Sequence, residues 1–367
     1  MRKLLLFVCS IVGVTLFAAP EISGLKVTSI APMGLAIDYN VSGATNGCYL
    51  SVSMTGNGTN YLAKTLSGET NCVNGAHRVY WNMAEEGITS VGADISVKVK
   101  YAVGVGALYC VIDLAGGSTA ASYPVTYLNA EPSGGFNTTE YKTTKLVLKR
   151  VDPGKFKMGN STDVTLTKAF YMGLYEVTQK QWVLVKGSNP SWFSGETKPV
   201  ENVSYNDIRG SSEGAKWPAT NSVDATSFLG KLRAKTGIDF DLPTEAQWEY
   251  TCRAGTTTTY SYGDSAKGDY MWFLDNSSSL THEVGTKKAN PWGFYDMHGN
   301  VFEWCLDWDA SLLGGEDPKG SSSGLYRMNR GGSCSHRASS CTSSCRVSYR
   351  PDQTSSGRGF RLSRTLP

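Results

Sequence analysis

The thirteen residues 292–304 combine side chains that could do chemistry more densely than any other part of this chain. They hold five aromatic residues, two glycines and two carboxylates, in an order that fits neither a helical nor a strand period. The pattern Asp296-x-x-Gly299-x-Val301-x-Glu303 supplies two carboxylates and several main-chain carbonyls, with a glycine that lets the chain turn. Calcium binds six to eight oxygens of this kind, so the segment predicts a calcium site. The alternative for Glu303 is a salt bridge or a contact at a helix end.

A second block of this kind begins with Arg330-Gly331-Gly332-Ser333 and continues to His336 and Cys341. Thiols and an imidazole in one segment could bind a metal or form disulfides. Two other histidines, His282 and His298, have no third ligand at metal-like spacing. We therefore expect those two to be core or surface residues.

The chain opens with the pattern of an export signal. Arg2 and Lys3 precede an apolar run over residues 4–17, and Ala18-Ala19 provide small residues for cleavage. This predicts a signal peptide over residues 1–19. The apolar run is short for a membrane span, so we expect no stable span after cleavage. The expected location is secreted, periplasmic or at the cell surface.

Composition narrows the class of protein further. The formal charge of +3 on 367 residues is close to neutral, and the basic residues are scattered, which argues against nucleic acid as a partner. Charged residues make up only 18% of the chain, and glycines are abundant, as in loop-rich or β-rich extracellular proteins. The length is sufficient for two domains.

The elements that must position these residues differ between the two halves of the chain. Residues 20–129 show short alternating runs separated by turn residues, which is typical of an antiparallel β-sandwich of immunoglobulin or fibronectin type III kind. Cys48 and Cys72 lie in neighbouring segments there and could form a disulfide. Four runs carry the prediction: Leu25–Ile30, Leu35–Tyr39, Asp94–Tyr101 and Tyr109–Leu114.

A segment rich in Pro, Gly, Asn and Thr, residues 130–144, reads as a linker to a second domain over residues 145–367. Two helices are predicted in that domain. One spans Ser222–Lys235 and stops at Gly237, and the other starts at the N-cap Thr244 and runs to about Arg253. The rest is loop-rich, so the predicted class is α+β.

The motifs of the second domain, taken in order, resemble the formylglycine-generating enzyme or sulfatase-modifying factor family. The resemblance covers about 220 residues. Its motifs are Phe156-Lys157-Met158-Gly159, Tyr175-Glu176-Val177-Thr178, Pro199-Val200-Glu201-Asn202-Val203-Ser204, Leu242-Pro243-Thr244-Glu245-Ala246-Gln247-Trp248-Glu249-Tyr250, the aromatic segment 292–304, Arg330-Gly331-Gly332-Ser333 and Gly359-Phe360-Arg361.

The resemblance implies a variant of the C-type lectin fold with little regular secondary structure. It also implies structural calcium, bound by the residue matching Asp296, by the carbonyls matching Gly299 and Val301, and by the carboxylate matching Glu303. An Asp stands here where the family also uses Asn.

The family's enzymes oxidise a sulfatase cysteine to formylglycine with oxygen, using two cysteines that bind copper(I), an ion that prefers soft thiolates. The family places these at the third and eighth positions after the Gly-Gly-Ser motif. Counting from Ser333, those positions hold His336 and Cys341, so one cysteine is matched and one is replaced. An alignment anchored on Arg346 instead removes Cys341 from the catalytic position. Phe302 also stands where the family usually has Trp.

A structural role for these thiols is the alternative. In the family, a cysteine matching Cys252 forms a disulfide with the C-terminal block, so Cys252 is expected to pair with Cys341 or Cys345. Loss of such a bridge from an exported domain costs about 2–5 kcal/mol. Another bridge, or a copper site that includes His336, stays open for the remaining cysteines.

Three functions are consistent with the sequence. The first is an exported binding module for a peptide or a glycan at a surface groove, without oxidase activity. The second is a copper-dependent oxidase acting on sulfatase cysteines, with Cys341, His336 and Ser333 as its site residues. The third is a structural protein of the cell surface. Copper uptake would distinguish the second function from the other two.

Overall fold

The computed structural model describes residues 21–30, 34–42, 48–56, 59–62, 66–68, 75–84, 88, 95–103 and 107–366. The chain divides into two compact units. The first runs to Ala107 and includes Thr126–Leu128, and the second comprises Leu108–Val125 and the chain from Asn129 onward. The predicted signal peptide and Cys72 lie outside the described residues, so the bridge from Cys48 to Cys72 stays a prediction.

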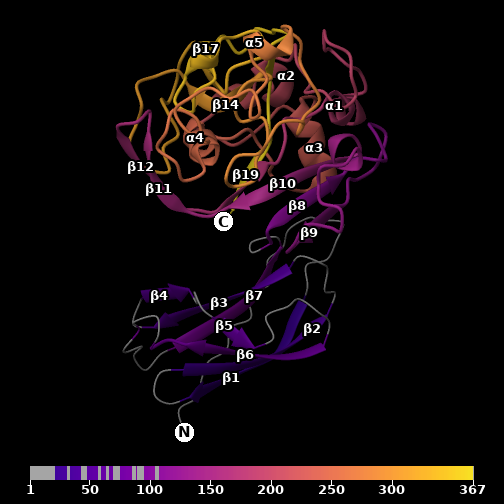
Figure 1. The fold of residues 1–367 in the computed structure, drawn as a ribbon. Helices are drawn as coiled ribbons and strands as arrows, with labels where there is room; N and C mark the ends of the chain where they lie inside the picture. Colours follow the sequence, from indigo (N-terminus) through magenta and orange to yellow (C-terminus); the bar gives the residue numbers. More distant parts are fainter. Residues whose placement is uncertain are drawn as a thin grey trace. The chain divides into compact units, whose positions relative to one another are not determined.

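Two antiparallel sheets build the first unit, drawn as the indigo and purple strands of Figure 1. One sheet has the order β1-β2-β6-β5 and the other β4-β3-β7. The strands are β1 (Glu21–Ile30), β2 (Gly34–Ser42), β3 (Cys48–Gly56), β4 (Thr59–Leu62), β5 (Leu66–Gly68), β6 (Gly75–Asn82) and β7 (Ile95–Val103).

The alternating residues of these strands divide between core and solvent. Ile37 of β2 and Val79 and Trp81 of β6 are buried, while Arg78 and Tyr80, which alternate with the latter two along β6, are exposed. Period-two alternation puts every second side chain on one face, so the apolar set packs inward. The predicted antiparallel sandwich is confirmed.

The last strand assigned to the sandwich from the sequence belongs to the second unit instead. Strand β8 (Tyr109–Asp113) pairs antiparallel with β10 (Lys145–Val151), and Cys110 lies opposite Leu148. Its residues are buried almost without interruption, as in a strand covered on both faces. An unbroken apolar run fits any buried sheet, which is why the sequence did not identify its partner.

Residues 130–144 likewise belong to the second unit rather than forming a linker. Phe136 is buried and packs against Tyr109 and Tyr141, with ring centroids 4.7 and 4.8 Å apart. The boundary predicted at residue 145 therefore lies well inside a compact unit that begins at Leu108.

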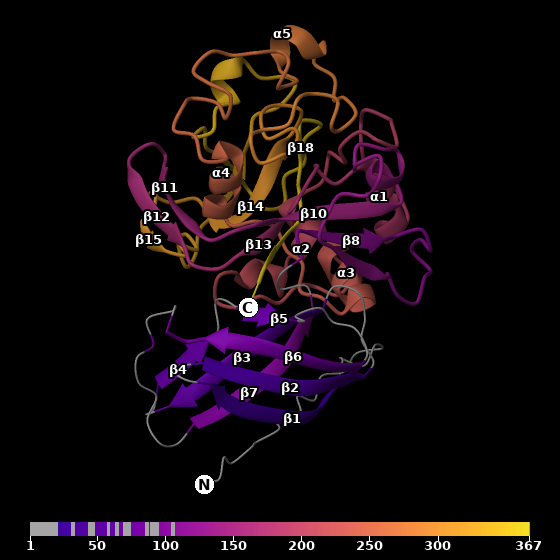
Figure 2. The same cartoon turned by 60° about the horizontal axis from the view of Figure 1, so that its bottom comes forward.

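Three sheets organise the second unit. β19, β13, β10 and β8 lie side by side in that order, β11-β12-β15 form a second sheet, and β17-β16-β14-β18 form a third. Figure 2 shows β11, β12 and β15 together along one flank of the unit. The strands of this unit not yet given are β11 (Gly154–Met158), β12 (Thr162–Leu166), β13 (Phe170–Gly173), β14 (Phe302–Trp308), β15 (Gly315–Glu316), β16 (Arg327–Arg330), β17 (Val347–Tyr349), β18 (Arg358–Gly359) and β19 (Ser363–Thr365). Strand β9 (Val125–Leu128) belongs to the first unit except for Val125.

The helices of the second unit are short. They are α1 (Gln179–Lys186), α2 (Tyr205–Arg209), α3 (Phe228–Thr236), α4 (Glu245–Arg253) and α5 (Leu274–Ser277), with 3₁₀ turns at Glu140–Lys142, Gly214–Lys216 and Ala338–Ser340. Long irregular stretches connect them, so the predicted α+β class with little regular structure in this unit is confirmed.

The two helices predicted from the sequence are present. The Thr244 hydroxyl accepts from the Gln247 amide at 3.1 Å and the Gln247 side chain accepts from the Thr244 amide, which is a complete capping box at the start of α4. Helix α3 begins at Phe228, six residues later than predicted, because Ser227 is its N-cap and Asp224 accepts from backbone amides of a neighbouring loop.

Aromatic side chains fill the core around these elements. Trp182 of α1 stacks on Phe228 of α3, with centroids 5.1 Å apart, and the ring of Phe360 meets both edge-on. Trp248 of α4 and Trp304 of β14 are also fully buried. The family motifs thus supply core aromatics from segments far apart in the sequence.

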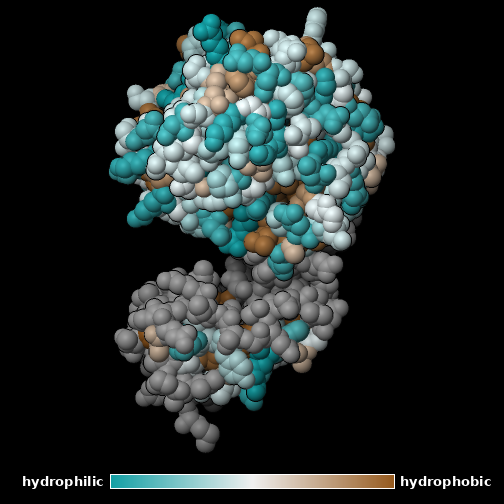
Figure 3. All heavy atoms as spheres, viewed as in Figure 1, coloured by the Kyte–Doolittle hydropathy of each residue, from teal (hydrophilic) through white to brown (hydrophobic). Residues whose placement is uncertain are grey.

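The face of the second unit in Figure 3 is mainly hydrophilic, with small separate hydrophobic areas. Among the described residues, no helix is both long enough and apolar enough to cross a bilayer.

Candidate functional site

Ser333 and His336 form one polar pair where the resemblance places the oxidase site. The Ser333 Oγ lies 2.6 Å from His336 Nδ1, and the edge-on ring of Phe302 lies 4.9 Å from the imidazole. Burial lowers the pKa of His336 from its ordinary value, so the ring is neutral at pH 7. The Ser335 amide donates to Ser333 Oγ at 3.3 Å, which leaves the hydroxyl proton for His336.

Cys341 lies against the backbone of Gly332 and Ser333, and its thiol is buried in an apolar cluster. The residue is fully buried in a cluster with Tyr260, Met271 and Phe273. Its Sγ donates to the Arg337 carbonyl at 3.7 Å. Burial raises the pKa of Cys341 to about 12, so the group is a protonated thiol at neutral pH.

Gly332 explains how the chain reaches this arrangement. It has φ of +80°, and a Cβ at this position would lie 2.8 Å from Cys341 Cα and 2.4 Å from its sulfur. Only glycine combines that left-handed backbone with so close an approach. The Gly-Gly-Ser motif therefore serves to pack the loop against Cys341.

The predicted disulfides of Cys252 are not formed. Cys252, Cys341 and Cys345 are all free thiols. The Cys252 sulfur donates to the Met297 carbonyl at 3.6 Å and lies 3.7 Å from His298 Nε2. Its buried position raises its pKa to about 12, so Cys252 behaves as a small core residue here.

His298 is buried between these segments. Its Nδ1 is 2.7 Å from the Cys341 carbonyl, and its Nε2 accepts from the Ser261 amide at 3.2 Å. Burial lowers its pKa to about 4. A neutral ring with Nδ1 as donor satisfies both contacts, so His298 is a core residue that joins two loops.

The two carboxylates of the predicted calcium segment have different surroundings. Asp296 is buried, its Oδ2 accepts from the Gly285 amide at 2.6 Å, and its Oδ1 has no hydrogen-bond partner. An orphaned carboxylate oxygen of this kind suits a cation. Glu303 instead faces Arg361, with Oε2 accepting at 2.6 Å and Oε1 at 2.5 Å.

The Trp248 indole also donates to Glu303 Oε2 at 2.7 Å, so three N–H groups occupy that carboxylate. The salt-bridge alternative for Glu303 is therefore confirmed. The calcium site of Asp296, Gly299, Val301 and Glu303 stays a prediction of the resemblance. Among the described residues, no set of three or more acidic, histidine or cysteine side chains is arranged for a metal.

Glu176 and Arg361 complete this buried cluster, although sequence reasoning assigned no role in it to either residue. Glu176 accepts from the Asn300 side chain at 2.6 Å and from the Val301 amide at 3.2 Å. Burial, then Asp296 and Glu303, raise the pKa of Glu176. Burial also raises the pKa of Asp296 to about 6. The only available signal was that both residues belong to family motifs, which says nothing about partners.

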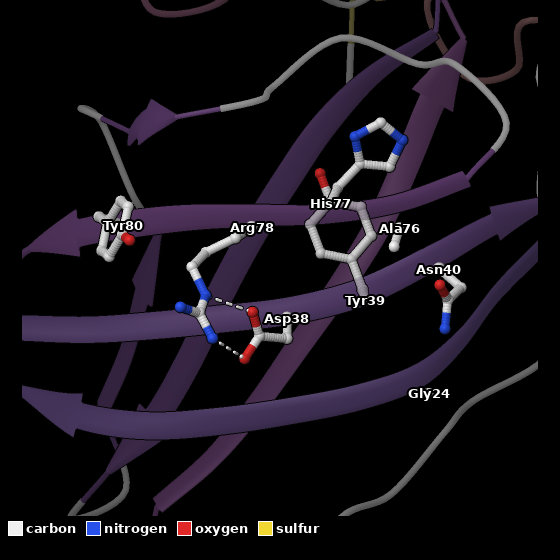
Figure 4. A pocket seen from close by; sticks show the side chains of 8 residues that line it. All are labelled: Gly24, Asp38, Tyr39, Asn40, Ala76, His77, Arg78 and Tyr80. Carbon is white, nitrogen blue, oxygen red and sulfur yellow. Dashed lines mark hydrogen bonds and ion pairs between the residues drawn. The ribbon is translucent and has the colours of Figure 1, made fainter.

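The first unit carries an open hollow of about 580 Å³ on the outer face of β1, β2 and β6. Figure 4 shows Arg78 and Asp38 facing each other there, with two parallel contacts, one of 2.8 Å. The hydrogen bond to Arg78 lowers the pKa of Asp38. The two charges compensate each other, so this hollow offers a ligand little unpaired charge.

The second unit carries two neighbouring hollows, of about 430 and 180 Å³, that share Tyr250. Phe156 lies on one side of Tyr250 at 5.2 Å and Trp292 on the other at 4.9 Å between ring centroids. We call these three rings and the two hollows the aromatic groove. Lys149 lines the larger hollow and Lys155 the smaller.

These observations define an α+β protein in which a β-sandwich accompanies a unit with the fold of formylglycine-generating enzymes. Residues 135–366 match the family described as the sulfatase-modifying factor enzyme 1-like domain. The chain belongs to that family.

Several known proteins are similar to it. Chaperone protein LppX of Paenibacillus barcinonensis is 34% identical over 221 residues, covering 50% of this chain and 76% of that protein. The formylglycine-generating enzyme of Mus musculus is 30% identical over 208 residues, covering 49% of this chain and 50% of the enzyme. The chain thus spans about half of that enzyme's length. The solved structure of Treponema denticola variable protein 1 has a TM-score of 0.51 at 28% identity, covering 61% of this chain and 96% of that one.

Proposed function

We propose that this protein is an exported binding module of the sulfatase-modifying factor family, which recognises a peptide or a glycan and does not oxidise cysteine. The observation that carries the proposal is the position of Cys341. Its thiol is buried among Tyr260, Met271 and Phe273 and has a pKa of about 12. A copper(I) site needs accessible thiolates, and burial opposes the charged form.

The position of the family's second cysteine also supports the proposal. His336 occupies the position of the other family cysteine, and its Nδ1 is 2.6 Å from Ser333 Oγ. Imidazole is a harder ligand than thiolate, and this one is already hydrogen-bonded. Cys341, His336 and Ser333 therefore resemble a packed loop more than an oxidase site.

The aromatic groove supports a role in binding. Concave surfaces lined by aromatic rings and a few polar groups are where proteins usually bind ligands. The similarity to Chaperone protein LppX, a relative whose name denotes no oxidase, is consistent with a function that does not need the cysteine pair. Calcium would act here only as a structural ion, through Asp296.

The alternative is a copper-dependent formylglycine-generating oxidase with a rearranged site. It would use the Cys341 thiol together with Cys334, Cys345 or His336, and it would need that buried thiol to become accessible and ionised. A purely structural role at the cell surface is the third possibility, and it predicts no ligand for the aromatic groove.

Copper(I) titration against a chromogenic chelator tests the proposal on the exported protein after mild reduction. We expect no high-affinity copper and no oxidation of a cysteine-containing sulfatase peptide, with Cys341→Ser indistinguishable from wild type in both assays. One tightly bound copper that is lost in Cys341→Ser, together with peptide oxidation, would establish the oxidase instead.

A further inference from the structure

We infer that the aromatic groove is a binding site for an anionic polysaccharide, of the kind that carries carboxylates on its sugar rings. The inference rests on the proposed binding function and specifies its ligand. It begins from the three rings of Phe156, Tyr250 and Trp292, which come from β11, α4 and the irregular segment before β14.

The rings lie where a sugar chain can reach them. Phe156 and Trp292 are half-buried and line separate hollows, while Tyr250 is mostly buried and lies between them. The apolar C–H faces of pyranose rings pack well against aromatic faces, because both are flat and weakly polar. Two hollows on either side of one ring suit consecutive sugar units.

The floor of the groove depends on a glycine. A Cβ on Gly154 would lie 2.1 Å from the Tyr250 hydroxyl oxygen, so any other residue there would displace the ring. This close approach joins the start of β11 to α4 and sets the position of the shared ring.

The polar rim provides hydroxyl and amide groups for sugar hydroxyls. Asn160, Thr256 and Thr257 line the smaller hollow. The side-chain Oδ1 of Asn160 accepts from the Arg253 guanidinium at 2.6 Å, which leaves the side-chain amide protons of Asn160 for a ligand. Thr257 is exposed at the edge of the hollow.

Charge at the groove favours an anionic chain over a neutral one. Three of its cations are already paired: Arg150 with Asp152 at 2.9 Å, Lys157 with Asp163 at 2.8 Å, and Arg253 with Glu249 at 2.8 Å. Within the described part of the chain, neither Lys149 nor Lys155 forms an ion pair with a carboxylate.

The Lys149 ammonium donates to the Trp292 carbonyl at 2.8 Å, which holds its charge beside that ring. One uncompensated amine thus lines each hollow, Lys149 in the larger and Lys155 in the smaller. A chain with a carboxylate on each sugar would meet both amines while its rings pack on Phe156 and Trp292. The hollow on the first unit lacks this property because its charges are paired internally.

The test uses the full exported protein and polygalacturonate as probe, with binding measured by affinity electrophoresis and calorimetry. Neutral galactan and polyglutamate are the comparison polymers. We expect binding to polygalacturonate that weakens with salt, and about tenfold loss of affinity in Trp292→Ala and in Lys155→Glu. Matched controls are Trp192→Ala, whose ring is 78% exposed away from the groove, and Lys168→Glu, also outside it.

Equal losses in the groove variants and their controls, or no binding to polygalacturonate, would overturn the inference. Preferential binding of polyglutamate with the same variant sensitivity would assign the groove to acidic peptides instead. Thermal unfolding identifies any variant that fails to fold, and Lys149→Met then replaces it. Copper uptake with peptide oxidation would refute the proposed function separately, whatever the polymers do.

Discussion

At Cys341, the surrounding side chains decide the chemistry of the residue. The same thiol beside a cation or at a helix N-terminus would be a nucleophile and a metal ligand. Enclosed by Tyr260, Met271 and Phe273, it contributes packing and no charge. Counting from a motif locates such a residue along the chain, but the count cannot give its environment.

The buried ion pair between Glu303 and Arg361 should contribute strongly to the stability of the second unit. Both side chains are fully buried, and Arg361 also faces a cluster that contains Glu176 and Asp296. Arg361→Met should lower the free energy of unfolding by about 3–5 kcal/mol, because it leaves buried carboxylates without a cation. Arg364→Met is the matched control, since its partner Asp239 is 61% exposed, and it should cost at most about 1 kcal/mol. Urea denaturation measures both.

A variant of Asp296 tests the calcium prediction. Because Asp296 Oδ1 is buried without a hydrogen-bond partner, we expect calcium to raise the Tm of the wild type and to leave that of Asp296→Asn unchanged. A wild-type Tm that does not respond to calcium would contradict the predicted site.

The buried carboxyl of Glu201 should make the stability of the fold depend on pH. It is fully buried, its Oε1 accepts from the Phe193 amide at 2.7 Å, and burial raises its pKa to about 7. The folded state holds the proton of Glu201 more tightly than the unfolded chain does, so the protonated carboxyl stabilises the fold. This stabilisation is complete below about pH 4.5 and is lost as the pH rises through 7.

Between pH 5 and 8, the wild type should therefore lose about 2 kcal/mol of stability relative to Glu201→Gln. Unfolding curves at several pH values measure the difference. Glu196→Gln, at an exposed ion pair with Lys180, should follow the wild type. Parallel pH profiles for wild type and Glu201→Gln would contradict the buried protonated form.

Among the helices, the start and stop residues in the sequence predicted the structure correctly where one residue acts on its near neighbours in the chain. The capping box of α4 and the stop of α3 at Gly237, with φ of +70°, follow directly from sequence order. Helices α1 and α2 also begin with capping boxes, Thr178 with Gln181 and Ser204 with Asp207. These helices are not predicted from the sequence, because Thr178 and Ser204 are interpreted there only as the ends of family motifs.

The N-cap of α4 can be measured directly. Thr244→Ala removes the hydroxyl that accepts from the Gln247 amide and should cost about 1 kcal/mol of stability. Thr220→Ala changes an exposed residue outside any helix and should be neutral. Equal effects in chemical denaturation would mean that packing of the helix makes its cap redundant.

Long-range pairing could not be predicted at this scale. The alternation of β1, β2 and β7 identified strands correctly, whereas β8 was placed in the wrong sheet. The partners of the buried charges are equally remote, since Glu303 and Arg361 are 58 residues apart and Glu176 and Asn300 are 124 apart. Sequence periodicity describes a face to be buried but does not name what covers it.

For the molecule as a whole, the position of β8 determines which fragments of the chain can fold as the second unit. A fragment beginning at Leu108 retains β8 beside β10, while one beginning at Lys145 leaves an apolar strand edge unpaired. We expect the longer fragment to unfold cooperatively and the shorter one to aggregate, as measured by thermal unfolding and light scattering. Equal solubility and Tm would show that β8 is dispensable.

Strand β19 (Ser363–Thr365) pairs with β13, and Arg361 neutralises Glu303, so residues 361–365 complete contacts with segments far away in the sequence. Until these five residues are in place, β13 has a free strand edge and Glu303 is a buried acid without its cation. Formation of the second unit therefore depends on a long-range step, and a defect in this short segment should weaken the unit as a whole rather than one strand.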